Sequence, residues 1–203
     1  MIRSLDDLAH ITRQWAREPD GFEDEELRSP GLSTVELRRL TDALPGMPAS
    51  YLDVLARFDL RGVSLSYFEL TPAVGDDLVQ TLLEANDPDE YLHRRYLEPS
   101  KLYIVASWEA DWICVARDLP DRPGGEVIGI EMVGLAEPRT YRMAPSFAVA
   151  MLVAGNLLRA LDDPDMVGMP GLESFLAGLA ELGLDEEQQG AWRYLIGISG
   201  FER

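Results

Sequence analysis

The sequence of 203 residues contains one cysteine, two histidines and half as many basic as acidic side chains. A single cysteine, Cys114, cannot form an internal disulfide, which favours a reducing compartment. The first fifteen residues lack the apolar run of a secretory signal peptide, and the longest apolar stretch, near 146–158, is too short to span a bilayer. We therefore expect a soluble, cytoplasmic protein without a membrane partner.

Sequence patterns of the common catalytic and metal sites are also missing. His10 and His93 are expected on surface helices, and neither belongs to a Ser-His-Asp or Cys-His arrangement. No CxxC, HExxH or EF-hand spacing occurs, and the glycine pair at 124–125 is typical of a hairpin turn rather than a phosphate loop. Cys114 lies inside an apolar run, where a core thiol is the simplest interpretation. We therefore predict that the protein is not an enzyme and holds no cofactor or metal.

Acidic charge dominates the composition, with 36 acids against 18 bases and a formal net charge of −18. Nucleic acid is a poor partner for such a chain, because a binder must neutralise phosphates with Lys and Arg. The excess is concentrated outside the centre of the chain: residues 34–99 carry 12 acids and 6 bases, whereas residues 100–144 carry 7 and 5. Two interpretations stay open, a surface for a basic partner or acidic helices that only maintain solubility.

The centre of the chain, residues 101–132, predicts β-structure. It contains the runs LYIVASW, WICVA and VIGIEM, which are rich in β-branched and aromatic residues and are separated by polar or Gly-Pro-rich breaks. Ile128, Ile130 and Met132 recur at period two, as on one face of an antiparallel strand. Further strands are expected at 63–70 and 139–143, so the middle of the protein is predicted to be an antiparallel meander.

Helices are predicted before and after this meander. Ser4 with Asp7, and Ser33 with Glu36, match N-terminal capping patterns. Apolar residues also recur at helical spacing in five later segments. One begins at Pro48 and one after Pro145, and the other three cover 76–85, 172–182 and 185–196. The order of helices, strand, helix, strands and helices indicates an α+β fold.

The segment TVELRRLTDALPGMPASYLDVLARF resembles the opening of the SUKH superfamily, the Smi/Knr-like proteins. The matching positions are a Leu-Pro helix end and a tyrosine with an apolar face, here Leu44, Pro45, Tyr51, Leu55 and Phe58. IVASWEADWICVA and GEVIGIEM are similar to strands of that family, and the Ser-Phe pair at 146–147 is similar to the start of its closing helix. The sequence departs from the family in having FDLRGV after the tyrosine helix and no glycine-rich turn between the paired strands.

The resemblance implies a SUKH-like domain over residues 33–161, with an antiparallel sheet of four to six strands packed with helices. Residues 1–32 are then an N-terminal helix with an acidic linker, and residues 162–203 a C-terminal helical extension packed on the same domain. It also implies an immunity protein that binds a cognate polymorphic toxin, for example a basic nuclease delivered by a contact-dependent or type VI system, and blocks it by occlusion. The alternatives are a regulatory or scaffolding adaptor of the same fold and, least supported, a hydrolase.

Candidate partner-binding residues come from three acidic and aromatic clusters. The WEADW segment is predicted to be the tip of a hairpin, where two tryptophans either cap the core or anchor a partner beside two acids. Two more acidic groups flank the helix expected at 76–85, where acids also favour a helix start. The full set is Trp108, Glu109, Asp111, Trp112, Asp76, Asp77, Asp87, Asp89, Glu90 and Tyr91.

Overall fold

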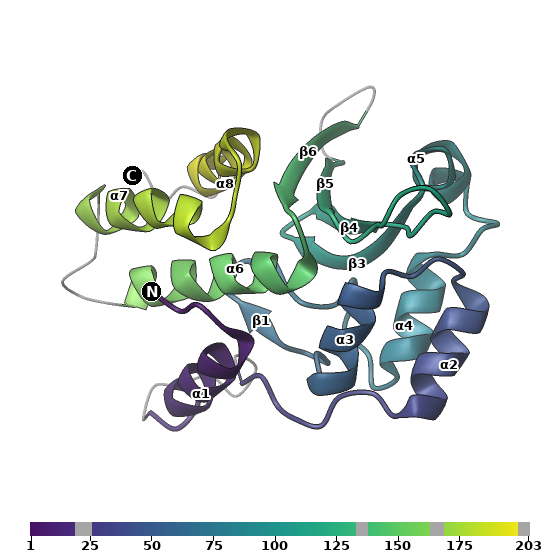
Figure 1. Ribbon diagram of the computed structural model, residues 1–203, viewed down its shortest axis with the longest axis horizontal. Coiled ribbons are helices and arrows are strands. Elements are labelled where there is room, and N and C mark those ends of the chain that lie inside the picture. The colour runs from purple at the N-terminus through teal and green to yellow at the C-terminus, as the bar shows by residue number, and fades with distance from the viewer. Residues whose placement is uncertain (19–25, 133–137, 163–168, 199–203) are drawn as a thin grey trace.

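The computed structural model describes residues 1–18, 26–132, 138–162 and 169–198 (Figure 1). Six antiparallel strands form one sheet in sequence order: β1 (Ser64–Leu65), β2 (Phe68–Glu69), β3 (Leu102–Trp108), β4 (Asp111–Ala116), β5 (Val127–Glu131) and β6 (Arg139–Ala144). The helices are α1 (Leu5–Trp15), α2 (Thr34–Ala43), α3 (Ala49–Arg57), α4 (Leu78–Ala85), η2 (His93–Leu97), α5 (Glu98–Ser100), α6 (Phe147–Asp162), α7 (Met169–Gly178), η3 (Leu179–Leu182) and α8 (Glu186–Ile198). The predicted α+β class, with an antiparallel sheet of four to six strands packed with helices, is confirmed.

Local sequence accounts for where the helices begin. The Ser4 hydroxyl accepts a hydrogen bond from the Asp7 backbone N–H at 3.1 Å and caps α1. Ser33 and Glu36 form the complete capping box of α2, with 2.7 Å from the Ser33 N–H to Glu36 Oε2. Asp77 caps α4, so that helix begins at Leu78 rather than at residue 76. None of the helices in the described parts of the chain is long and apolar enough to cross a membrane.

The single strand expected at 63–70 is instead a tight hairpin of two short strands, β1 and β2. The chain reverses at Ser66, which has a φ of 62°, and the Ser64 hydroxyl donates to the Ser66 carbonyl at 2.8 Å. This local hydrogen bond competes with an extended backbone. Because β2 is so short, it pairs with β3 only at Trp108 and Ser107. The rest of that edge of β3 stays open to other contacts.

Figure 1 shows α6 running through the middle of the molecule, between α1 and the side that carries the sheet and α8. Its first residue, Phe147, lies 5.0 Å from Tyr51 of α3 in a T-shaped ring contact. Phe68 of β2 joins Phe147 to Trp192 of α8, and Trp192 lies 5.5 Å from Trp108. Aromatic rings from α3, the sheet, α6 and α8 therefore meet in one core.

A β-bulge decides which side chains of β3 enter this core. The register of β3 with β4 shifts between Ile104 and Ala106, and this places both Val105 and Ala106 in the main core. Trp108 consequently faces the same side. The inner face of the sheet is thus the one covered by α6 and α8.

The outer face of the sheet carries a second, smaller apolar cluster. Its buried members are Leu97, Leu102, Ile104, Cys114 and Ile130, and the partly buried Ala85, Trp112, Ala116, Ile128 and Met132 pack against them. The predicted common face of Ile128, Ile130 and Met132 is confirmed. This face is covered less completely than the inner one, and it borders α4.

Candidate functional site

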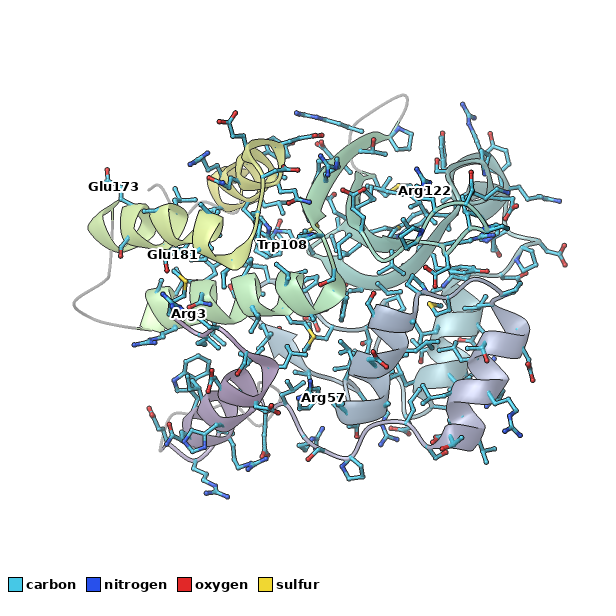
Figure 2. The ribbon with its side chains drawn as sticks, viewed as in Figure 1. Arg3, Arg57, Trp108, Arg122, Glu173 and Glu181 are labelled. Atoms are coloured by element: carbon cyan, nitrogen blue, oxygen red, sulfur yellow. The ribbon has the colours of Figure 1, made fainter. Side chains whose placement is uncertain are left out.

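The first candidate cluster, the β3–β4 hairpin, divides between the two faces of the sheet. Trp108 is only 1% exposed and lies inside the molecule (Figure 2). Its ring centroid is 5.5 Å from that of Trp192. It therefore offers no surface to a partner, and the interpretation of Trp108 as a core residue is the correct one. Its ring is instead the link between the sheet and α8.

Asp111 is also buried, at 6% exposure, and so it leaves the candidate contact surface. The Tyr141 hydroxyl donates a hydrogen bond of 2.7 Å to Asp111 Oδ2. Burial raises the pKa of Asp111, an effect that the Tyr141 hydroxyl and the Met132 backbone N–H oppose and that the nearby Glu131 and Glu109 reinforce. Burial likewise raises the pKa of Tyr141, to which the Asp111 hydrogen bond adds. The pair is an internal feature of the inner face.

Glu109 and Trp112 remain at the surface. Glu109 is exposed in the two-residue turn and has a φ of 50°, a left-handed conformation that costs a non-glycine residue energy. Trp112 pairs with Ser107 and points to the outer face, where it is partly buried against Ile104 and its neighbours. The hairpin thus presents one acid and one tryptophan, half of the set expected there.

Asp76 and Asp77, which were expected as the first residues of the helix, lie just before α4, and Asp77 is its N-cap. Its carboxylate accepts the Gln80 backbone N–H at 3.0 Å and pairs with Arg39 of α2 at 3.1 Å. These two contacts, the backbone bond first, lower the pKa of Asp77. Asp76 is exposed, and its backbone carbonyl accepts from Arg61 at 2.9 Å. The start of α4 is therefore partly neutralised from within the chain.

The third cluster, Asp87, Asp89, Glu90 and Tyr91, follows the end of α4 and is exposed throughout. Asp87 accepts the Asp89 backbone N–H at 2.9 Å, and the Tyr91 ring is 58% exposed with the Arg95 guanidinium over it. None of the three acids forms an ion pair within the described residues. This end of α4 therefore carries three exposed carboxylates, followed by the exposed Arg94 and Arg95 of η2.

Asn86 fixes that end of α4 to the sheet, which the sequence analysis did not foresee. The Ile104 backbone N–H donates to Asn86 Oδ1 at 2.8 Å, and Asn86 Nδ2 donates to the Ile104 carbonyl at 2.8 Å. The amide thereby replaces a strand partner on the open edge of β3, next to the bulge. Its effect is to hold α4 at a fixed distance from the outer face.

A groove of about 270 Å³ lies between α4 and the outer face of the sheet. We call it the α4 groove; its lining residues are Pro72, Ala73, Val74, Thr81, Glu84, Ala85, Ile104 and Trp112. Only Trp112 belongs to the predicted set. Val74 is 91% exposed at the rim, and an apolar residue in the turn-like segment TPAVGDD was the one local signal that pointed here.

The charged side chain that lines the α4 groove is acidic. Glu84 is exposed, and its described hydrogen bond comes from Gln80 Nε2 at 2.8 Å, a neutral donor. Glu84 lines the groove, and Asp76, Asp87 and Glu109 lie within three residues of a lining residue along the chain. Together with Asp89 and Glu90 they are six exposed carboxylates without an ion pair in the portion of the chain that the structure covers. An apolar groove beside unpaired carboxylates can bind a cationic group that has an apolar stem.

The nucleophilic and basic side chains lie elsewhere or are buried. Cys114 is fully buried, as predicted, and burial raises the pKa of its thiol. His93 was expected at the surface but is only 6% exposed, and burial together with the nearby Arg117 lowers its pKa. Among the described residues, no group of three His, Cys, Asp or Glu side chains is placed to hold a metal ion.

Comparison of the chain with protein-family models, with curated proteins and with solved structures gives no match.

Proposed function

We propose that the protein binds a basic protein partner through the α4 groove and the acidic surface around it. The observation that carries the proposal is an apolar groove lined by the exposed Glu84, with five further exposed carboxylates in nearby segments that form no ion pair within the described residues. Acidic residues that only maintained solubility would need no such groove and no exposed Val74 at its rim. A partner with complementary charge would gain a faster association rate and a defined orientation.

The partner in this proposal is a bacterial toxin, and the protein is its immunity protein. Support comes from the resemblance of residues 33–161 to the SUKH superfamily, whose bacterial members are often immunity proteins. The net charge of −18 suits a toxin with a basic, nucleic-acid-binding surface. The proposed mechanism is occlusion, in which the acidic face covers the toxin's active site and no chemistry is required.

Growth of a susceptible host that expresses the toxin domain encoded next to this protein tests the proposal. Co-expression of the wild-type protein should restore growth, and the two chains should purify as a stable complex whose affinity falls as salt rises. A variant in which Glu84, Asp87 and Glu109 are replaced by Gln or Asn should restore growth less well. Absence of both rescue and complex would overturn the immunity proposal in favour of an adaptor role.

A further inference from the structure

The α4 groove has the size of a site for one side chain. Its volume of about 270 Å³ lies below the roughly 300–1,000 Å³ usual for small-molecule pockets. The floor is apolar and fixed, because Ile104 is only 4% exposed and its backbone is held by Asn86. A short apolar stem would therefore find a preformed surface here.

The sheet side and the α4 side of the groove differ in chemistry. Trp112 contributes an indole ring on the sheet side, and indole is the best cation–π partner among the aromatic side chains. Glu84 contributes a carboxylate on the α4 side. A carboxylate accepts up to about four hydrogen bonds, and Glu84 receives one in the described structure, from Gln80. Charge and ring together favour a cation.

Gln80 orients the Glu84 carboxylate. Its amide oxygen accepts a hydrogen bond of 3.0 Å from Arg39 Nη2, while its amide nitrogen donates to Glu84 Oε1 at 2.8 Å. Arg39 is itself held by Asp77. The chain Arg39–Gln80–Glu84 therefore fixes one carboxylate oxygen and leaves the rest of that group for a ligand. Arg39 is committed to the start of α4 by these contacts.

We infer that the α4 groove binds one arginine side chain of the partner protein, an inference that rests on the proposed function. The methylene stem lies on Ile104 and the turn at 72–74, and the guanidinium stacks on Trp112 and donates to Glu84. Arginine is favoured over lysine because its planar group stacks on an aromatic ring and makes two parallel hydrogen bonds to a carboxylate. The complementary charge of the surrounding acids attracts it.

The direct test is a ¹H–¹⁵N NMR titration of the full-length protein with N-acetyl-arginine methylamide. The indole N–H signal of Trp112 should shift, while those of the buried Trp108 and Trp192 should stay in place. The neutral analogue N-acetyl-citrulline methylamide, which has the same shape without the charge, should bind at least about tenfold more weakly. Equal shifts with both compounds would overturn the inference.

Variants of two groove residues, with one control variant elsewhere, show where the arginine derivative binds. Glu84→Gln keeps the shape of the side chain and removes its charge, and Trp112→Leu keeps the apolar floor and removes the ring. Each should weaken arginine binding about tenfold. Asp53→Asn makes the same charge change on the exposed side of α3 and should leave binding unchanged. If Glu84→Gln and Asp53→Asn behave alike, general acidity attracts the probe and the assigned site is wrong.

The same variants separate this inference from the proposed function. If the wild-type protein restores growth and Glu84→Gln and Trp112→Leu bind the toxin as tightly as wild type, the immunity role stands and the arginine site is refuted. If arginine binds in the groove of the wild-type protein but no toxin complex forms, the site stands and the immunity proposal fails.

Discussion

Two tryptophans four positions apart, Trp108 and Trp112, have opposite environments on the two faces of one sheet. Trp108 is 1% exposed on the inner face, in contact with Trp192, whereas Trp112 is partly buried on the outer face beside the α4 groove. The inner face is closed by α6 and α8, and the outer face is left half-covered. The same residue type therefore belongs to the closed core on one face and keeps part of its ring exposed on the other.

The largest expected effect comes from truncating the two rings. Trp108→Ala should destabilise the protein by about 3–5 kcal/mol, because a large cavity opens in the aromatic core. Trp112→Ala should cost only about 1–2 kcal/mol, since part of its ring is already exposed. Urea denaturation followed by circular dichroism measures both.

Arginine binding should depend on Trp112 and not on Trp108, whereas stability should depend more on Trp108. Trp108→Phe keeps most of the core volume and should leave arginine binding to the folded protein intact, whereas Trp112→Leu should weaken it. If Trp108→Ala and Trp112→Ala lowered the free energy of unfolding equally, the two faces would not differ in the way that burial indicates.

A second way to disturb the inner face is to fill the space beside Tyr141. Gly129 pairs with Tyr141 across β5 and β6, and a Cβ on Gly129 would overlap carbons of the Tyr141 ring. Gly129→Ala should therefore cost about 1–3 kcal/mol by overpacking and displace the hydroxyl that bonds Asp111. Thermal unfolding would show the loss. Gly190→Ala of α8, where nothing lies within 4 Å of the new Cβ, is the matched control.

The sequence predicts the strands of the central meander and the shared face of Ile128, Ile130 and Met132, but not the faces of the β3–β4 hairpin. Runs such as LYIVASW and WICVA specify strands because β-branched and aromatic residues suit a sheet. One polar break over 109–111 predicts that both tryptophans lie at the tip of the hairpin. The turn contains only Glu109 and Ala110, so Asp111 begins β4, pairs with Trp108 of β3 and shares its buried face. A one-residue difference in a turn reverses every side chain that follows.

The α4 groove could not be predicted because its walls come from three separate segments. Residues 72–74, α4 and the β3–β4 hairpin meet only after the chain has folded, and Asn86 sets their spacing. The acidic residues around the groove are visible in the sequence, since charge needs no tertiary information. Which of them pair with bases inside the chain, as Asp77 does with Arg39, is a property of the fold.

Substitution of Glu109 should have a smaller effect, and it separates the stability of the protein from binding of the partner. Its φ of 50° suits glycine, so Glu109→Gly should stabilise the protein by up to about 1 kcal/mol in urea denaturation. The same change removes one of the six unpaired carboxylates and should weaken a toxin complex, most strongly at low salt. Glu109→Gln, which keeps the side-chain length and the strained backbone, should weaken binding without the gain in stability. A stabilised variant that binds as wild type would remove Glu109 from the contact surface.

The smallest expected effect is a pH dependence that arises on the inner face. Burial raises the pKa of Asp111 above its unfolded value of 3.8, so the folded protein holds a proton where the unfolded chain has lost it. Stability should therefore fall as pH rises from the unfolded pKa of Asp111 to its higher folded pKa. Asp111→Asn cannot titrate and should gain stability relative to wild type over that range, with a constant difference at higher pH.

Tyr141→Phe removes a donor that favours the charged carboxylate, so it should widen the pH dependence. Parallel profiles for wild type and Asp111→Asn in urea denaturation between pH 3.5 and 7.5 would show that Asp111 is not the buried acid the structure describes.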